Sequence, residues 1–464
     1  MIPISSEEYD VIVAGGGSAG VVAAIASARN GARTLLIEKN GFVGGDTTAG
    51  LVFCMGSFHN QLGEQVVKGI PQEIVDRAVK LGAVGHVISP VRPGKITMTF
   101  VDEEVLKFVE MEMLIESGVN LLLHTIVFNA FVEENKIRGL EVANKSGRQV
   151  VLGKVIVDAT GDGDVSAYAG APYIKGRKSD RLIIPPTMMF KMSNVNIDKV
   201  IQYIREHPEQ FAAGRGWSKG SDLTSPVIHC NLAGFTKEWN EALEKGELSK
   251  MIDPEHSSFL RPDPSRPDEV LVNMTRILNV DATDAKSLTY GEIEGRRQAW
   301  QCAIWLKKYI PGFENARLMV APQLGIREGR RIIGEYILTG LDVTSGRKFD
   351  DVIAKCAVGL DIHEPSEKGG HKFVPIKGGG SYDIPYRCIV PQKIENLLVA
   401  GRCISADDEA FSSIRWTVPC MATGQAAGTA AALAVKENVE PRYLNTKKLQ
   451  ETLLNQNVIL YGVS

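Results

Sequence analysis

Three glycines near the start of the chain and one acidic residue downstream have types and a spacing that suit one kind of chemistry. Gly15, Gly17 and Gly20 form the pattern G-x-G-x-x-G, and Glu38 follows about 20 residues later. The first glycine permits a tight turn, the second lets the backbone approach a pyrophosphate, and the third lets a helix lie close to the preceding strand. Glu38 can accept hydrogen bonds from a ribose. These residues predict dinucleotide binding, and the alternative is a glycine-rich turn without a ligand.

The elements around the glycines have to hold them in position. Val11–Ala14 is a short apolar run that suits a buried parallel strand. An alanine-rich helix pattern follows the glycines and stops at Gly31, and Thr34–Ile37 indicates a second strand that Glu38 closes. Backbone N–H groups and the helix dipole favour phosphate at such a helix start. Because strand, helix, second strand and acid are in register, the pattern favours the dinucleotide interpretation.

Small residues also follow three other apolar runs. Gly44 and Gly45 open a loop just after the acid-ended strand. The turn 159–161 (Ala-Thr-Gly) follows the buried strand that ends at Asp158, and Gly401 ends the run Leu397–Ala400. Small side chains at these points let the backbone approach a ligand closely. For the turn after Asp158, a loop with capping carboxylates is an equally good interpretation on its own.

The pattern changes twice along the chain. Residues 1–174 hold the fingerprint and a β-meander from Ile126 to Ile156, whereas residues 175–342 are richer in tryptophan, proline and charge. Residues 343–464 again have the apolar runs and glycine turns that are typical of residues 1–174. We therefore expect an α/β protein in which a Rossmann-like domain, built from 1–174 and 343–464, is interrupted by an α+β substrate domain at 175–342.

Apolar periodicity predicts further elements. We expect helices at Pro71–Leu81, from Val101 through Met113 with an end at Gly118, at Ile197–Arg205, Lys237–Leu248, Leu288–Tyr309 and Thr417–Ala434. We expect strands at Val119–His124, Thr187–Met192, Glu269–Asn273, Ala316–Ala321 and in the run that ends at Gly401. The helix from Thr417 has a small-residue face that lets it lie close to a sheet or cofactor, although alanine is also the best helix former.

Composition excludes several classes of function. The chain has 464 residues, 44% hydrophobic and 23% charged, with a net charge of −3, which implies no field for nucleic acid or membrane surfaces. The first strand follows the N-terminus too closely for a signal peptide, and the longest apolar stretch, near Ala426–Val435, is too short to span a membrane. The seven cysteines form no C-x-x-C pair and no metal-ligand spacing, so we expect no metal and a cytoplasmic location.

Seven motifs together resemble the bacterial FAD-dependent oxidoreductase family. They are VIVAGGGSAG…LLIEK, VGGDTTAG, VDATGDGDVSAYAGAP, GIREGRRIIGEYILT, DIHEP, YDIPYRCIVP and NLLVAGRCIS…SIRW…CMATGQAAGTAAALA. This family is a branch of the glutathione-reductase-like flavoproteins and is distantly similar to the flavoprotein subunits of fumarate reductase and succinate dehydrogenase. The resemblance covers nearly the whole chain. It implies an FAD-binding domain built from discontinuous segments and interrupted by a substrate domain.

The resemblance assigns cofactor contacts by position. It implies contacts along the whole of FAD, from the adenine and its ribose through the pyrophosphate to the ribityl chain and the flavin ring. The residues implied are Gly15, Gly17, Ser18, Ala19, Gly20, Glu38, Lys39, Gly44, Gly45, Thr47, Thr48, Val127, Ala159, Thr160, Gly161 and Gly401. Many relatives have an aspartate after the last of these glycines, whereas this chain has Arg402, which can reach a phosphate oxygen instead. The helix from Thr417 is expected to point its N-terminus at the flavin pyrimidine edge.

The cofactor expectation has independent support from the residues. Only one G-x-G-x-x-G unit is present, so a second domain for NAD(P)H is not expected, although hydride delivery without one remains open. No local histidine motif for covalent attachment is visible, so we expect noncovalent FAD.

Four residues are candidates for the chemistry. His363 is the candidate general acid or base, because its ordinary pKa is near neutral, and a structural loop histidine is the alternative. Arg327 can clamp a carboxylate, although arginines in such clusters are often ion-paired structurally. Tyr386 can hydrogen-bond a substrate or pack in the core, and Arg415 precedes the helix expected to face the flavin.

One departure from the family pattern bears on mechanism. Relatives usually have Thr-His soon after the GRCIS motif, where this chain has Asp407-Asp408-Glu409. Two roles suit this acidic run: it can face the active site and favour a polyhydroxylated or cationic substrate, or it can cap a helix.

The expected activity is removal of a hydride from a small organic substrate, with oxygen, a quinone or a protein as electron acceptor. The alternatives are flavin-dependent reduction of an activated double bond, and an FAD-binding subunit that acts through a protein partner. The sequence leaves the oligomeric state open.

Overall fold

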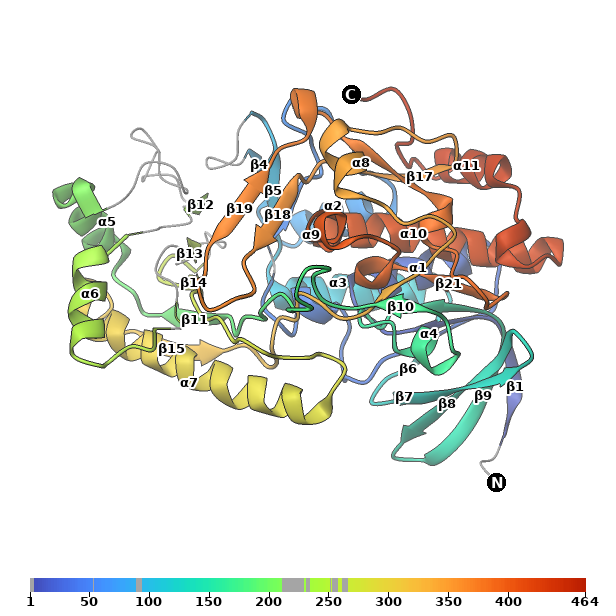
Figure 1. Ribbon diagram of the computed structural model, residues 1–464, viewed down its shortest axis with the longest axis horizontal. Helices are drawn as coiled ribbons and strands as arrows, with labels where there is room; N and C mark the ends of the chain where they lie inside the picture. The colour runs from blue at the N-terminus through green and yellow to red at the C-terminus, as the bar shows by residue number, and fades with distance from the viewer. Residues whose placement is uncertain are drawn as a thin grey trace.

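The N-terminal segment folds into a strand, a helix and a parallel second strand, as its pattern predicts (Figure 1). In the computed structural model these are β1 (Ile4–Ala14), α1 (Ser18–Arg29) and β2 (Thr34–Ile37). The two strands pair in parallel, with Val11 opposite Thr34 and Ala14 opposite Ile37. The structure describes residues 4–52, 54–88, 94–210, 229–230, 234–250, 252, 258–260 and 266–464.

These strands belong to a seven-stranded sheet in the order β6-β2-β1-β9-β8-β7, with β21 paired to β9. The added strands are β6 (Asn120–Leu122), β7 (Ile126–Glu133), β8 (Lys136–Asn144), β9 (Gly147–Asp158) and β21 (Leu397–Val399). β6, β2, β1, β9 and β21 are paired in parallel, whereas β7, β8 and β9 form the antiparallel meander. Because β21 joins strands from the first third of the chain, the sheet is assembled from discontinuous segments, and the α/β prediction is confirmed.

Helix α10 (Thr417–Glu437) packs against α1 through glycines. A Cβ atom at Gly424 would lie 2.2 Å from the carbonyl oxygen of Ala19, and one at Gly428 would lie 2.0 Å from that of Ala23. The small-residue face therefore lets two backbones touch. Among the described residues, α10 is also the one helix long and apolar enough to cross a membrane, but 94% of that window is buried inside the protein. Its composition suits a core helix equally well.

Other helices surround this sheet or follow it. They are α2 (Ile70–Lys80), α3 (Glu103–Glu116), α4 (Asp164–Tyr168), α8 (Gly340–Ser345), α9 (Asp408–Ile414) and α11 (Thr446–Asn455). Helix α3 starts where Asp102 accepts hydrogen bonds from the backbone N–H groups of Glu104 and Val105, and α2 starts with Pro71 in its first turn. Both helices lie within two residues of their predicted bounds.

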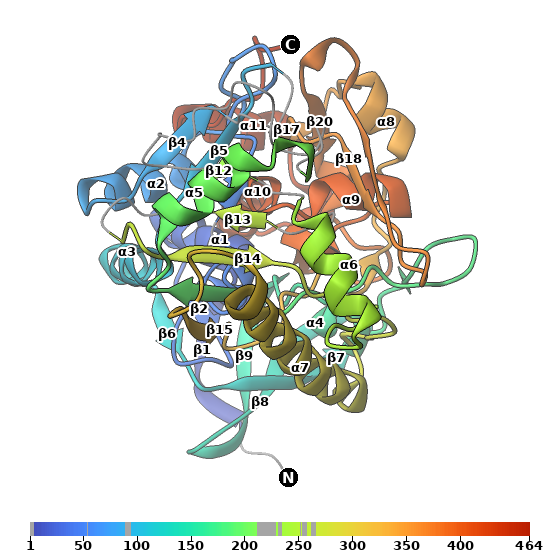
Figure 2. The same cartoon turned by 90° about the vertical axis from the view of Figure 1, so that its left-hand side faces the viewer.

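A second unit with its own apolar core lies at the left of Figure 1. Its antiparallel sheet has the order β12-β13-β14-β11-β15. The strands are β11 (Phe190–Ser193), β12 (His229–Cys230), β13 (Ser258–Leu260), β14 (Val270–Asn273) and β15 (Arg317–Val320), and the helices are α5 (Ile197–Glu206), α6 (Thr236–Glu244) and α7 (Ala285–Tyr309). Figure 2 looks onto this unit and shows these helices around β13 and β14. Where the chain enters and leaves, Thr187 and Gly325 exchange backbone hydrogen bonds of 3.2 and 2.9 Å.

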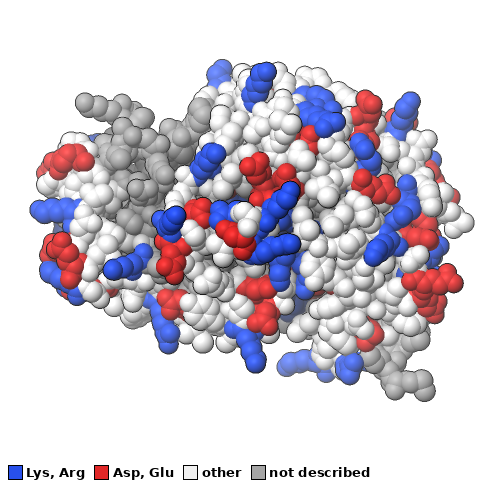
Figure 3. Space-filling view, viewed as in Figure 1, with Lys and Arg blue, Asp and Glu red and all other residues white. Residues whose placement is uncertain are grey.

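A buried ion pair joins the two units. The Nζ atom of Lys191 on β11, only 2% exposed, lies 2.7 Å from a carboxylate oxygen of Glu103 on α3 and 2.8 Å from one of Glu269. Two carboxylates thus balance one ammonium group away from water. On the face shown in Figure 3, by contrast, basic and acidic side chains are interspersed.

The smaller sheets did not follow from the sequence patterns. They are β3 (Cys54–Gly56) and β4 (Gly85–Ile88) on either side of β5 (Thr97–Phe100), and the pairs β10 (Tyr173–Ile174) with β16 (Arg331–Ile332), β17 (Val352–Cys356) with β20 (Tyr382–Pro385), and β18 (Leu360–His363) with β19 (His371–Val374). Each strand has two to five residues, too few for an alternation to be distinctive. The β18–β19 hairpin positions several side chains of the site.

Candidate active site

At the glycine fingerprint, several backbone segments approach one another closely. A Cβ atom at Gly20 would lie 1.8 Å from the carbonyl oxygen of Gly15, and one at Gly45 would lie 2.9 Å from Cα of Gly17. Gly17 also forms a backbone bridge with Gly44. Helix α1 begins at Gly17 with no side-chain cap and no acidic residue in its first turn. Its first N–H groups and its dipole therefore favour an anion.

Glu38 lies at the end of β2, buried and bound to backbone. Its Oε2 accepts a hydrogen bond of 2.7 Å from the N–H of Gly16, and its Oε1 accepts one of 2.8 Å from that of Asn40. Each carboxylate oxygen can accept a further hydrogen bond. The side chain is thus held beside the glycines with acceptor capacity left for a ribose hydroxyl. Its neighbour Lys39 is exposed.

Hydroxyl groups fix the shape of the second glycine loop. The Oγ1 atoms of Thr47 and Thr48 donate to the carbonyl oxygens of Gly44 and Val43, at 2.6 and 2.7 Å. Ser18 Oγ donates to the same Gly44 oxygen at 3.3 Å, which connects the loop to the start of α1. Val127, on the meander strand β7, is half-buried and lies opposite Val142.

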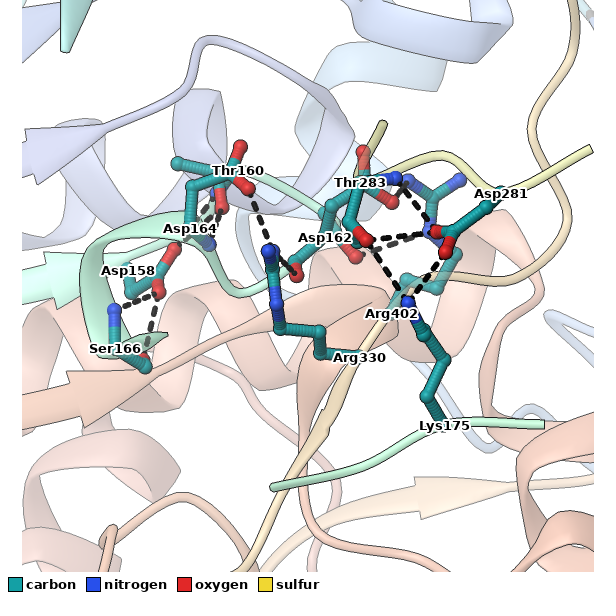
Figure 4. Close-up of polar contacts among 11 residues, drawn as sticks. Asp158, Thr160, Asp162, Asp164, Ser166, Lys175, Asp281, Thr283, Arg330 and Arg402 are labelled. Carbon is teal, nitrogen blue, oxygen red and sulfur yellow. Dashed lines mark hydrogen bonds and ion pairs between the residues drawn. The ribbon is translucent and has the colours of Figure 1, made fainter. Parts of the chain in front are cut away.

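The turn after β9 meets the fingerprint directly. A Cβ atom at Gly15 would lie 2.5 Å from the carbonyl oxygen of Ala159. Asp158 holds the turn, because it accepts hydrogen bonds from the N–H and hydroxyl of Thr160 and from those of Ser166 (Figure 4). Burial raises the pKa of Asp158, and these hydrogen bonds oppose the rise. The backbone at 159–161 is thereby fixed beside Gly15.

Gly401 and Arg402 connect the remaining segments. Gly401 adopts φ 81°, its N–H donates to Thr423 Oγ1 at 3.1 Å, and a Cβ atom there would lie 2.8 Å from the Cβ of Ala19. The turn therefore lies between α1 and α10. Arg402 extends from this turn toward the loop after β9 (Figure 4).

Arg402 bonds carboxylates and backbone oxygens on two sides. It lies 2.7 Å from an oxygen of Asp162 and 3.3 Å from one of Asp46, and its Nε donates to the carbonyl oxygen of Gly161 at 3.0 Å. Its Nη1 also donates to the carbonyl oxygen of Ile326. Burial raises the pKa of Asp162 to about 6, with Arg402 opposing, and the same two effects act on Asp46, whose pKa is also raised. From the sequence, Arg402 is expected to reach a phosphate oxygen; the structure shows these two carboxylates as its partners.

The arrangement fits a bound dinucleotide. Helix α1 starts without a cap and without an acidic residue in its first turn. The glycines beside it leave no room for a larger residue, and the buried carboxylate of Glu38 has free acceptor capacity next to them. Asp46 and Asp162 follow the two glycine-containing turns directly, so the position of an acid after each turn was the signal that sequence reasoning missed.

A second group of polar side chains surrounds the β18–β19 hairpin. Asp361 and His363 project from the same face of β18, and His371 lies opposite His363 on β19. Asp361 Oδ1 lies 2.7 Å from His371 Nε2, and its Oδ2 lies 3.4 Å from His363 Nε2 and 3.0 Å from Arg415 Nη2. One carboxylate thus orients two imidazoles and a guanidinium.

The environment of His363 corrects the expectation of a near-neutral pKa. The pKa of His363 is lowered to about 3, mainly by burial; Asp361 opposes this effect, and the positive charges of Arg327 and Arg415 add to it. The ring is therefore neutral at physiological pH. His371 and Asp361 were not predicted, although the alternation Asp-x-His on a short strand could have indicated that Asp361 and His363 share a face.

Arg327 and His363 line one pocket. The cavity holds about 380 Å³ of empty space, including its open mouth, and its other lining residues include Pro185, Thr187, Thr275 and Arg276. Arg327 Nη1 donates to the carbonyl oxygen of Pro185 at 2.7 Å and to the hydroxyl of Thr187. The pocket therefore lies at the base of the second unit, where Thr187 pairs with Gly325.

Two predicted residues have other roles in the structure. The buried hydroxyl of Tyr386 donates to the carbonyl oxygen of Pro441 at 2.8 Å, and Tyr386 does not line the pocket, so its geometry favours core packing. Asp407 caps α9, because its Oδ1 accepts from the N–H of Ala410 at 2.7 Å and its Oδ2 from that of Gly340 at 3.1 Å. The capping role considered for the acidic run is thus the one that Asp407 adopts.

One group of described residues has the ligand types for a metal ion. The ligand atoms of Asp361, His363 and His371 all lie within 4.8 Å of one another. However, Arg415 already bonds the same carboxylate, and a divalent cation would have to displace it. The positive charge nearby disfavours a cation at this place.

Comparisons with known proteins place the chain in a family. A curated relative, digeranylgeranylglycerophospholipid reductase 1 of Methanococcoides burtonii, is 23% identical over 244 residues, which are 48% of this chain and 54% of that protein. The tRNA uridine 5-carboxymethylaminomethyl modification enzyme MnmG of Alkaliphilus oremlandii is 28% identical over 172 residues, 35% of this chain and 25% of that protein. The chain thus spans about half the length of the first of these relatives and a quarter of the second.

Among solved structures, a geranylgeranyl bacteriochlorophyll reductase-like protein from Thermoplasma acidophilum aligns with 97% of this chain and 84% of its own, with a TM-score of 0.46 and 14% identity. The sequence model of the FAD dependent oxidoreductase family matches residues 10–453 of this chain. This match confirms the resemblance seen in the sequence and the expectation of FAD as cofactor. The chain belongs to the FAD-dependent oxidoreductase family.

Proposed function

We propose that this flavoenzyme oxidises a small organic substrate, removing a hydride from a carbon that bears a hydroxyl group, in the pocket lined by Arg327 and His363. One observation carries the proposal. Arg402 bonds Gly161, Asp46 and Asp162 at the glycine-rich end, and its Nη1 donates to the carbonyl oxygen of Ile326, next to Arg327. A single side chain therefore connects the cofactor-binding turns to the wall of the pocket.

Bound FAD supplies a two-electron acceptor beside the substrate. Conversion of a carbinol to a carbonyl releases two electrons and two protons, so an external acceptor has to take the electrons onward. Oxygen, a quinone or a protein can serve in that role. We propose that FAD is held noncovalently by the fingerprint, the Gly44–Gly45 loop, the turn 159–161 and Gly401.

His363 can receive the hydroxyl proton of the substrate. Its low pKa keeps the ring neutral before reaction, so one ring nitrogen can accept a proton while the other bonds Asp361. The carboxylate of Asp361 stabilises the imidazolium that results, and Arg327 and Arg415 destabilise it. The proton is therefore held briefly and passed on, and Asp361 acts by orienting the ring.

The start of α10 favours negative charge near the pocket. The helix begins at Trp416 without a side-chain cap and has no acidic residue in its first turn. Arg415, which precedes it, is fixed by Asp361. We propose that this helix end faces the flavin ring. The thiols of Cys302, Cys356, Cys388, Cys403 and Cys420 form no disulfide, which supports a cytoplasmic location.

An anaerobic reduction experiment tests the direction of the reaction. The flavin-containing protein is mixed with a panel of sugars, hydroxy acids and amines without oxygen, and the visible flavin absorbance is followed. A substrate that donates electrons bleaches it. A His363→Gln variant, which keeps a neutral side chain of similar reach, is expected to bleach about a hundredfold more slowly or worse. Equal rates for both proteins would exclude His363 as the proton acceptor.

The reverse reaction is the second candidate, because a curated relative is named as a reductase. Chemically reduced protein that is reoxidised by a compound with an activated double bond, and is bleached by no metabolite, would favour it. A protein that binds FAD and reacts in neither direction would favour a subunit that acts through a protein partner.

A further inference from the structure

Arg327 is bound only by neutral oxygens. Its Nη1 donates to the carbonyl oxygen of Pro185 at 2.7 Å and to the hydroxyl of Thr187. Across the described ranges it forms no ion pair with any aspartate or glutamate. A buried guanidinium without a carboxylate partner is costly, because water no longer solvates its charge.

Three other arginines of this region are compensated. Each has a carboxylate within hydrogen-bond distance: Arg331 with Glu328 at 2.5 Å, Arg402 with Asp162 at 2.7 Å, and Arg415 with Asp361 at 3.0 Å. Each of these three guanidinium groups thus has a balancing carboxylate. Arg327 has none among the described residues, and Arg276, the other arginine in the pocket lining, donates to the carbonyl oxygens of Glu364 and Ser366.

Positive charge exceeds negative charge around the cavity. The pKa of Arg327 is lowered to about 9, mainly by burial and also by the positive charges of Arg415 and Arg276. The guanidinium stays protonated at pH 7. Asp361 and Asp46 oppose the shift, but Asp361 already bonds Arg415 and His371, and Asp46 bonds Arg402. A bound anion would supply the missing negative charge.

The pocket can admit such an anion. It is open and includes Arg327, His363 and Arg276 in its lining. Both observed hydrogen bonds of Arg327 come from Nη1, so the other nitrogens of the planar fork are available for a planar carboxylate. His363, which is neutral, lines the same pocket.

We propose that Arg327 clamps the carboxylate of the substrate, so that the enzyme acts on a small organic acid that carries its oxidisable group close to the carboxylate. This inference rests on the function proposed above and narrows it to a substrate class. Arg327 then has two roles. Its Nη1 atom bonds Pro185 and Thr187 at the base of the second unit, and its other guanidinium nitrogens bind the carboxylate of the substrate.

The test compares several carboxylates and includes one neutral match of nearly the same shape. The FAD-containing protein is titrated calorimetrically without oxygen with glycolate, lactate and succinate, with lactamide as the neutral match for lactate, and with inorganic phosphate. We expect at least one carboxylate to bind and its amide to bind about tenfold more weakly or worse, because a hydrogen bond to a charged group is lost. Tighter binding of phosphate than of every carboxylate would overturn the carboxylate assignment.

Variants assign the binding to Arg327. Arg327→Met is expected to weaken carboxylate binding about ten- to a hundredfold, and Arg327→Lys, which keeps the charge, to retain part of the affinity. The matched control is Arg296→Met on α7, because Arg296 also donates to a proline carbonyl oxygen, that of Pro322 at 2.9 Å, but is exposed and paired with Glu292. It should bind as the unaltered protein does. If Arg327→Met fails to fold, the lysine variant decides.

The outcomes separate this inference from the proposed function. Failure of every carboxylate to bind, or equal affinity in the unaltered protein and the folded Arg327 variants, overturns the carboxylate clamp. If a neutral alcohol then bleaches the flavin, the oxidase or dehydrogenase function stands without it. If no compound reduces the flavin but carboxylates bind through Arg327, the clamp stands and the direction of the reaction is wrong.

Discussion

Glu110 on α3 is a buried carboxyl group whose replacement should stabilise the protein in a pH-dependent way. It is 1% exposed, and its Oε2 atom has no hydrogen-bond partner in the described part of the chain. A Cβ atom at Gly44 would lie 2.9 Å from this oxygen, so the group lies directly beneath the second glycine loop. Burial raises the pKa of Glu110 from 4.5 to about 8.

The sign and size of the effect follow from proton linkage. Between pH 4.5 and about 8 the folded protein keeps a proton on Glu110 that the unfolded chain has lost, so stability falls as pH rises. The loss approaches about 1.4 kcal/mol per pH unit and levels off near the folded pKa. Between pH 6 and 8 it amounts to about 2 kcal/mol. Glu110→Gln keeps the shape but removes the titration.

The assay is the free energy of unfolding from urea titrations at pH 6 and pH 8. The variant should gain about 2 kcal/mol relative to the unaltered protein between the two pH values, since all other groups titrate alike in both. Glu112→Gln, an exposed position on the same helix, is the control and should show no such change. Parallel pH curves for Glu110→Gln and the unaltered protein would refute the reasoning.

Three further substitutions test the contacts that assemble the fold and the site. Gly428→Ala places a Cβ atom 2.0 Å from the Ala23 oxygen, so α1 and α10 must separate; the expected loss is about 1–3 kcal/mol or more, and an unchanged urea midpoint would contradict it. Lys191→Met leaves the buried carboxylate of Glu103 without its cation and should cost about 3–5 kcal/mol, whereas a loss below about 1 kcal/mol would show that water reaches the pair. Arg402→Met should weaken FAD binding about tenfold or more in a fluorescence titration, with the circular dichroism spectrum intact; undiminished affinity would mean that its ion pairs do not position the cofactor turns.

The sequence could predict those elements whose pattern is long or chemically specific. The fingerprint, the meander and the helices at Ile197, Ala285 and Thr417 repeat apolar residues over many positions, and most of their predicted bounds agree with the structure within a few residues. The glycine positions indicated close contacts between backbones, such as the contact at Gly428. The small sheets were not predictable, because strands of two to five residues carry too little periodicity.

The candidate site was predictable in its parts but not in its connections. His363 and Arg327 were identified by type, yet nothing in the sequence showed that burial would lower the pKa of His363 to about 3 or that Asp361 would orient it. Tyr386 could not be distinguished from a substrate contact, because its partner Pro441 lies 55 residues away in the chain. Such partners are set by tertiary packing.

The central claim is that this chain binds FAD and transfers electrons through it. The most direct measurement is the visible absorption spectrum of the purified protein, recorded before and after anaerobic addition of the substrate panel. We expect the flavin absorbance bands at about one FAD per chain, released on denaturation as the proposed noncovalent attachment requires, and bleached by a small hydroxy acid. A protein that lacks these bands even after FAD is added would contradict it.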